Sequence, residues 1–201
     1  MKRQRRRIWE ASCFHMYIKM IPTDKLRKTI EIPDGVEIEI GEKILVKGPN
    51  GTVEKKLISP FAEIKKEDKK IIIEPKNFTK RAKKIINTFN AHIKNMIKGV
   101  QESFVYKLKI VSSHFPMNVS VENDKVVIKN FYGEKVPRIA KILPGTKVKV
   151  DGDIVIVESP DKEKAGQTAA NIELATKRLG YDRRLFQDGI WIIEKAGKPI
   201  K

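Results

Sequence analysis

The sequence contains the same plan of strands, loops and a helix twice, with matching points 82 positions apart. KILVKGPNG begins at Lys43 and KVVIKNFYG begins at Lys125, so in both halves a β-branched run leads to a loop closed by Gly51 or Gly133. A second apolar run and a helical segment follow in each half. This period is too long for a solenoid repeat and predicts two small domains of one topology. Because the two halves share few identical residues, a coincidence of two ordinary α+β patterns stays open.

The predicted fold class is α+β, with two tandem domains of similar topology. Each domain is expected to be a mostly antiparallel sheet packed by one main helix, because short alternating runs precede one long helical pattern in each half. The predicted segments are a basic N-terminal extension (1–20), a first domain (21–103), a second domain (104–182) and a basic C-terminal strand and tail (183–201).

The first half predicts a hairpin and a helix. Asn50-Gly51 is expected to supply the positive φ angles of a tight turn between two strands. The helix should run from about Asn77, its N-cap, to Lys98. The predicted buried face is Ala82, Ile85, Ile86, Phe89, Ile93, Met96, Ile97 and Val100. The lysines off this face contact either phosphate or only solvent, and the sequence leaves both open.

The second half predicts strands on either side of a loop at 130–138, and then a second helix. This helix should run from its N-cap, Asp161, to Leu179, with Gly180 in the left-handed position after it. Its inward side is expected to consist of Ala165, Ala169, Ile172, Ala175 and Leu179.

The charge is unbalanced along the whole chain. There are 42 Lys+Arg against 25 Asp+Glu, which gives a net charge of +17. Residues 1–20 contribute +5, and 21–106 and 107–201 contribute +6 each, so the excess is not confined to a tail. Lysine near phosphate releases condensed counterions, and this distribution therefore favours a polyanion such as nucleic acid as the partner. Thermophilic surfaces are also rich in lysine, but they usually balance the two signs.

Several classes of site have no support in the sequence. One cysteine, Cys13, excludes an internal disulfide and a multi-Cys zinc site, and the three histidines lack metal-ligand spacing. No phosphate loop, dinucleotide-binding glycine pattern or hydrolase motif is present, so we expect no enzyme, no cofactor and no metal. The absence of a long apolar run or a secretory leader pattern predicts a cytoplasmic protein without membrane contact.

The remaining candidate binding residues lie in basic loops that contain aromatic residues and glycines. FYGEKVPR at Phe131 combines two aromatic side chains, a glycine and the cations Lys135 and Arg138. The aromatic side chains stack on bases or fill the domain core, and for Phe131 the core is favoured. Closer to the C-terminus, Lys177, Arg178, Arg183 and Arg184 lead into FQDGI, and arginines suit bidentate phosphate contact.

Five ordered blocks resemble the universal large-subunit ribosomal protein L six family in its archaeal and eukaryotic form. The resemblance spans about residues 21–198. The blocks are VKGPNG at Val46, TFNAHIKNMIKGV at Thr88, NFYGEKVPR at Asn130, GQTAANIE at Gly166 and DRRLFQDGIWIIEKAGK at Asp182. The resemblance implies a structural constituent that binds large-subunit rRNA near the sarcin–ricin loop and the translational GTPase region. It also implies neighbouring ribosomal proteins as partners, transient proximity to translational GTPases, and a monomer within the ribosome.

Carried over by position, the resemblance implies a set of rRNA contacts, strongest in the closing block. The candidates are Lys135, Arg138, Gln167, Asn171, Lys177, Arg178, Arg183, Arg184, Lys195 and Lys198. Gln167 and Asn171 either contact RNA or pin their helix. The chain departs from the family pattern at four positions, Leu174, Arg178, Tyr181 and Trp191. Tyr181 stands where the family has a cation, so it is expected to stack, with Arg178 restoring the charge nearby.

Three hypotheses therefore remain: a ribosomal constituent, a free RNA-binding regulator, and an RNA-processing enzyme that uses a carboxylate such as Asp182 or Asp188. Only the first explains the five ordered blocks. For residues 1–20, two interpretations stay open. They form a basic arm that grips RNA, or translation starts at Met16 or Met20.

Overall fold

The computed structural model describes residues 26–67, 69–77, 79–182 and 184–200. The described residues group into two compact units, one from 26–32 and 58–90 and the other from 33–57 and 91–200. Residues 1–20 and Arg183 lie outside the described residues, so what the sequence predicts for them stays a prediction.

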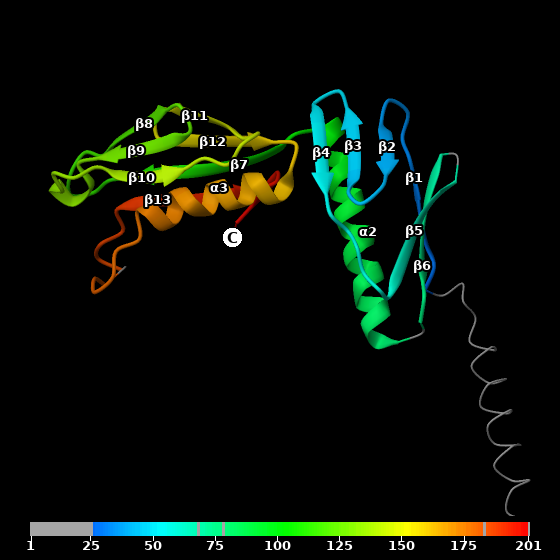
Figure 1. The fold of residues 1–201 in the computed structure, drawn as a ribbon. Helices are drawn as coiled ribbons and strands as arrows, with labels where there is room; N and C mark the ends of the chain where they lie inside the picture. The colour runs from blue at the N-terminus through cyan, green and yellow to red at the C-terminus, as the bar shows by residue number, and fades with distance from the viewer. Residues whose placement is uncertain (1–25, 68, 78, 183, 201) are drawn as a thin grey trace, which may run out of the picture. The chain divides into compact units, whose positions relative to one another are not determined.

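Two short antiparallel sheets contain the strands of the first half of the chain (Figure 1). The strands are β1 (Lys28–Glu31), β2 (Glu37–Ile40), β3 (Ile44–Gly48), β4 (Gly51–Lys55), β5 (Ala62–Glu67) and β6 (Lys70–Pro75). One sheet has the order β1-β6-β5 and the other β2-β3-β4. In the latter, Val46 pairs with Ile38 and Val53, and all three are buried because apolar and polar residues alternate along these strands.

The first long helix, α2 (Lys80–Gln101), lies three residues further along the chain than predicted. The predicted cap at Asn77 is wrong: Thr79 Oγ1 accepts a 3.1 Å hydrogen bond from the Ala82 N–H. Threonine and asparagine both suit this position, so the local pattern does not choose between them. The predicted apolar face is confirmed, with Ile85 partly buried and the others buried. The buried residues are Ala82, Ile86, Phe89, Ile93, Met96, Ile97 and Val100.

The turn between β3 and β4 differs from the predicted one. Gly48 pairs with Gly51, and of the two predicted residues only Gly51, with φ 134°, has a positive φ. Asn50 instead caps the end of α2, since its backbone N–H donates to the Val100 carbonyl (3.1 Å) and its side-chain amide donates to the Gln101 carbonyl (2.6 Å). The hairpin tip is thus built to satisfy carbonyls that the last helical turn leaves open.

The second half repeats the strand order of the first. Its strands are β7 (Phe104–Val111), β8 (Asn118–Glu122), β9 (Lys125–Lys129), β10 (Arg138–Lys141), β11 (Lys147–Asp151) and β12 (Ile154–Ser159). The order β7-β12-β11 corresponds to β1-β6-β5, and β8-β9-β10 corresponds to β2-β3-β4. In both halves a helix follows, α2 in the first and α3 (Lys162–Ala175) in the second. The fold is therefore α+β with two tandem domains of similar topology, as the repeat predicts.

The second half adds two strands, β13 (Gly189–Lys195) and β14 (Lys198–Pro199). β13 pairs with β7, so the sheet has the order β11-β12-β7-β13-β14, and Ile190 in β13 is fully buried. α3 lies along this sheet (Figure 1) and contacts β7, β12 and β13 as well as β10. Alanines on its inner side allow this close approach, since Ala165, Ala169 and Ile172 are all fully buried.

The predicted end of the second helix is wrong. α3 ends at Ala175 instead of Leu179, because Thr176 donates its hydroxyl to the Glu173 carbonyl and accepts a hydrogen bond from the Ile190 N–H. Leu179 is consequently 79% exposed instead of facing the core. The predicted loop at 130–138 contains a 3-10 turn, Phe131–Gly133, and already joins strand β10 at Arg138.

Candidate nucleic-acid interface

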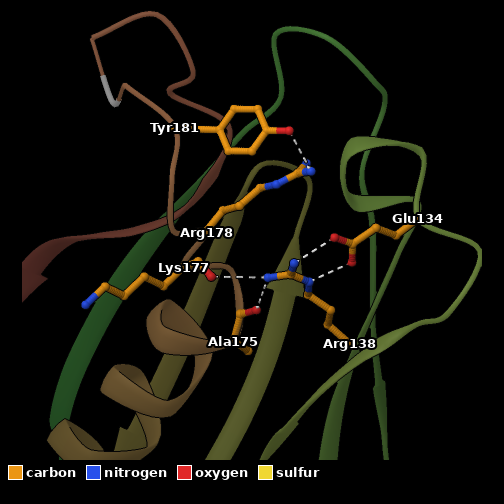
Figure 2. Close-up of polar contacts among 6 residues, drawn as sticks. All are labelled: Glu134, Arg138, Ala175, Lys177, Arg178 and Tyr181. Atoms are coloured by element: carbon orange, nitrogen blue, oxygen red, sulfur yellow. Dashed lines mark hydrogen bonds and ion pairs between the residues drawn. The ribbon is translucent and has the colours of Figure 1, made fainter.

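Arg138 ties the 130–138 loop to the end of α3 (Figure 2). Its guanidinium makes a bidentate pair with the Glu134 carboxylate, at 2.7 and 2.8 Å, and this contact lowers the pKa of Glu134. It also donates to the carbonyls of Ala175 (3.0 Å) and Lys177 (3.3 Å) and lies over the Phe131 ring, 4.3 Å from its centroid. Four of its five N–H groups are therefore used within the protein.

Arg178 is held by aromatic rings instead of a carboxylate. Its guanidinium carbon lies 4.1 Å from the centroid of the Tyr181 ring and 4.9 Å from that of Tyr132. One nitrogen donates to the Tyr181 hydroxyl at 2.9 Å (Figure 2). No described carboxylate forms an ion pair with it, so its charge is oriented but not neutralised. Tyr181 thus lies against Arg178, and its expected stacking in place of a phosphate contact stays a prediction.

The loop that carries Arg184 is fixed by two aspartates. Asp182 accepts the N–H of Arg184 at its carboxylate (2.9 Å) and the N–H of Phe186 at its carbonyl (2.9 Å). Asp188 is 5% exposed and accepts hydrogen bonds from the N–H groups of Ser113 (2.6 Å) and His114 (3.1 Å). Burial acts to raise the pKa of Asp188, but these hydrogen bonds bring it below its usual value. Both carboxylates therefore serve the loop conformation, which leaves the hypothesis of an enzyme without its proposed groups.

Aromatic side chains join this loop to the preceding one. Phe186 stacks on His114 with ring centroids 5.2 Å apart and meets Tyr181 edge-on at 5.0 Å. Tyr132 lies 6.2 Å from Phe186 and 4.8 Å from the buried Phe131. The favoured core position of Phe131 is confirmed by its 1% exposure. An open hollow results, lined by Tyr132, Thr176, Lys177, Arg178, Tyr181, Phe186, Asp188 and Trp191.

A second pair of cations lies at the other end of β13. Lys195 and Lys198 face each other across the β13–β14 hairpin, and both are exposed. Like charges at directly opposite positions destabilise an antiparallel pair unless an anion lies between them. β13 extends from Gly189 to Lys195, so this pair lies about 20 Å from the Arg184 loop.

The remaining candidate residues are either exposed or hydrogen-bonded within the protein. Lys135 and Lys177 are exposed, and neither forms an ion pair in the described part of the chain. Gln167 donates to Asn171 Oδ1 (3.0 Å), and Asn171 donates to the Lys141 carbonyl (3.2 Å), which pins α3 to β10. The structure thus brings Lys177 and Arg178 together in one hollow, whereas Lys195 and Lys198 form a separate group.

Comparison with known proteins decides the family. The sequence pattern of the family described as Ribosomal protein L6 matches residues 32–103 and again 115–189. The chain belongs to the ribosomal protein L6 family. It is 49% identical over 176 residues to the large ribosomal subunit protein uL6 of Methanococcus vannielii, covering 87% of this chain and 97% of that protein. It is 47% identical over 173 residues to the protein of the same name from Methanosarcina mazei, covering 86% and 98%.

Membership of the L6 family confirms two expectations. The two matched segments correspond to the two halves with equal strand order, so the repeat belongs to the family and is not a coincidence. Proteins of this family are structural and not enzymes, which confirms the absence of an enzymatic role. Within the described ranges, no cluster of possible metal ligands occurs. None of the helices in that part of the chain has the length and apolarity to span a bilayer.

Sequence reasoning missed the structural use of Arg138. Glu134 precedes Arg138 by four residues, a spacing typical of an ion pair within the protein. The prediction considered only the cations, glycine and aromatic residues of this loop. It also missed that His114 and the backbone of Ser113 anchor Asp188, because these residues are 74 and 75 positions away in the sequence.

Proposed function

We propose that the chain is a structural constituent of the large ribosomal subunit that binds large-subunit rRNA. The observation that carries this proposal is its similarity to uL6 proteins over nearly their whole length, together with exposed cations that lack acidic partners among the described residues. The exposed cations are Lys135, Lys177, Arg184, Lys195 and Lys198. The half-buried Arg178 also has no ion pair in the described ranges, and Arg183 joins them as a prediction from the sequence.

Within this interface the cations have different roles. Arg178 presents a pre-oriented guanidinium to a phosphate, because two tyrosine rings hold it without neutralising its charge. Lys195 and Lys198 share one phosphate, which removes their mutual repulsion. Arg138, Gln167 and Asn171 support the interface, since their polar groups hold the loop and the helix in place.

The resemblance further supports a position near the sarcin–ricin loop, with translational GTPases in transient proximity and ribosomal proteins as neighbours. The chain then acts as a monomer within the cytoplasmic ribosome. We propose the domain boundaries 21–103 and 104–182, with 183–201 as part of the rRNA-binding surface and 1–20 as a basic extension.

Sedimentation of the native chain tests the proposal. A cell extract is run through a sucrose gradient at high salt, and mass spectrometry locates the chain and its N-terminal residue. We expect it to travel with the large subunit, because many phosphate contacts and buried neighbours resist salt better than a peripheral association does. A chain that stays at the top of the gradient, at low salt as well, would instead be a free RNA-binding regulator.

A further inference from the structure

The outer face of α2 carries a stripe of lysines that the interface described above does not use. From residue 75 to residue 101 the sequence holds seven Lys or Arg and no Asp or Glu. α2 is one uninterrupted helix of 22 residues (Figure 1). At about 100° per residue, the lysines fall within an arc of about 100°, on the side of the helix away from the buried residues. They are Lys80, Lys83, Lys84, Lys94 and Lys98, and all five are exposed.

These lysines lack the acidic partners that several strand lysines have. On the strands, Lys43 pairs with Glu54 at 3.2 Å and Lys47 with Glu39 at 2.6 Å. Lys107 likewise lies 2.9 Å from Glu194. None of the five α2 lysines forms an ion pair with any residue in the described ranges, and the helix itself offers no carboxylate.

Their placement is unfavourable for the isolated protein. Lys80, Lys83 and Lys84 lie in the first two turns, where the helix dipole favours negative charge, and the first turn contains no acidic residue. Lys80 and Lys84 are four residues apart, as are Lys94 and Lys98, and like charges at this spacing repel each other. A polyanion lying along the stripe would relieve both effects, and this relief would favour its binding.

The chemistry of the face selects RNA among the possible anionic partners. Between its two lysine clusters the exposed positions are Asn87, Thr88 and Ala91, so the stripe has no aromatic or large aliphatic side chain. Protein interfaces are usually centred on such anchors. A membrane would need the apolar face of the helix, but that face is buried within the protein. Lysine clusters separated by short neutral residues suit a sugar–phosphate backbone, which is contacted through its charge and not its sequence.

We infer that the lysine stripe of α2 is a second RNA-binding surface, which follows a phosphate backbone and lies outside the interface of the second domain. The inference rests on the proposed function, because it takes the RNA to be large-subunit rRNA. From Lys80 to Lys98 the stripe is about 27 Å long. Arg81 adds a neighbouring cation, whose guanidinium lies over the Phe61 ring at 5.0 Å.

The test measures the salt dependence of RNA binding and the thermal midpoint with the full chain. The probe is archaeal large-subunit rRNA transcribed in vitro. In the variant Lys83→Glu/Lys84→Glu, the slope of log K against log salt concentration should fall by about 1.4 to 1.8, the value for two lost phosphate contacts. The thermal midpoint of the same variant should rise, because the new carboxylates lie near the positive end of the helix dipole.

The matched control is Lys125→Glu/Lys149→Glu, which changes the charge equally at exposed strand lysines without ion pairs in the described residues. This control should leave the slope unchanged. A second variant at the far end of the stripe, Lys94→Gln/Lys98→Gln, should lower the slope like the first, and it introduces no new charge near the helix N-terminus.

Other results would overturn either the inference or the proposed function. A higher thermal midpoint with an unchanged slope in both stripe variants would make the lysines a solvated face and overturn the inference. If the stripe variants lose binding to purified ribosomal proteins while their rRNA slope is unchanged, the stripe binds an acidic protein. This result would also overturn the inference. If the unsubstituted chain fails to bind this rRNA more tightly than a random-sequence RNA duplex, the proposed function itself fails.

Discussion

At the scale of single residues, two arginines of the same surface have opposite roles. Arg138 is neutralised by Glu134 and uses four N–H groups inside the protein, whereas Arg178 is held by two tyrosine rings and keeps its charge. The sequence marks both positions simply as cations near glycine and aromatic residues. Each arginine has a carboxylate four residues away in the sequence, Glu134 for Arg138 and Asp182 for Arg178. Only the fold of the loops brings Glu134 to Arg138, whereas Asp182 accepts the backbone N–H of Arg184.

Replacing Arg138 should therefore destabilise the protein. Arg138→Lys loses the bidentate pair and at least one of the carbonyl contacts, because an ammonium group cannot reproduce the planar geometry of the guanidinium. We expect a loss of about 1.5 to 3 kcal/mol in the free energy of unfolding, measured by urea denaturation. Arg178→Lys should change this stability by less than about 1 kcal/mol, since it breaks no carboxylate pair. Equal losses in the two variants would contradict the division of roles.

Asp188 makes a contribution to stability that depends on pH. The pKa values of Asp188 and Glu134 are both lower in the folded protein than in free side chains. Their stabilisation is therefore complete above the unfolded values of about 4 and is lost as the pH falls through the folded values. Asp188→Asn should cost about 1 to 3 kcal/mol at pH 7, because its amide cannot accept all the hydrogen bonds of the carboxylate.

The measurement is the thermal midpoint of both proteins between pH 7 and pH 3. The difference between the wild type and Asp188→Asn should shrink below about pH 4, because the carboxylate of the unfolded chain binds a proton there, whereas that of the folded protein does so only at lower pH. Glu134→Gln serves as the comparison, since it removes the other carboxylate with a lowered pKa. A constant difference across the whole range would contradict the anchoring role of Asp188.

At the scale of elements, alternation of apolar and polar residues located most strands, whereas helix ends and short strands were missed. The sequence identified the buried face of α2 because eight apolar residues at helical spacing outweigh any local ambiguity. It misplaced the end of α3 because Thr176 stops the helix through contacts with Glu173 and Ile190, and Ile190 lies 14 residues further on. β10 was missed because its four residues follow a proline and carry little pattern.

The hairpin between β3 and β4 contacts the end of α2 through Gly48 and Asn50. A Cβ atom on Gly48 would lie 2.0 Å from Val100 Cγ1, so Gly48→Ala should force the hairpin away and cost about 1 to 3 kcal/mol. Asn50→Ala removes a hydrogen bond to the Gln101 carbonyl and should cost about 1 kcal/mol.

Urea denaturation of the single variants measures these losses. Gly41→Ala is the matched control: its nearest atom would be the Lys43 carbonyl oxygen at 3.9 Å, and Gly41 has no positive φ. It should therefore be neutral or slightly stabilising. If Gly48→Ala proves as harmless as Gly41→Ala, the hairpin does not depend on close contact with the helix end.

At the scale of the whole molecule, the excess charge is distributed over surfaces that the fold separates. The sequence predicted a nucleic-acid partner from the even spread of this charge, but it could not group the cations. Their grouping depends on strand pairing, which sets Lys195 opposite Lys198, and on the length of β13, which separates them from Arg184. Strand pairing between distant segments is a property of the tertiary fold, and so it was not available from local patterns.

This separation makes a prediction about additivity. Arg184→Glu and Lys195→Glu/Lys198→Glu change groups about 20 Å apart, beyond the range at which substitutions usually couple. If one rRNA contacts both groups at once, the losses in binding free energy should add within about 0.5 kcal/mol in the triple variant. The measurement is a titration with the in vitro transcribed rRNA at one fixed salt concentration. If one of the two changes causes no loss, so that the triple variant binds like the weaker of the other two, only one group contacts this rRNA and the interface is limited to one end of β13.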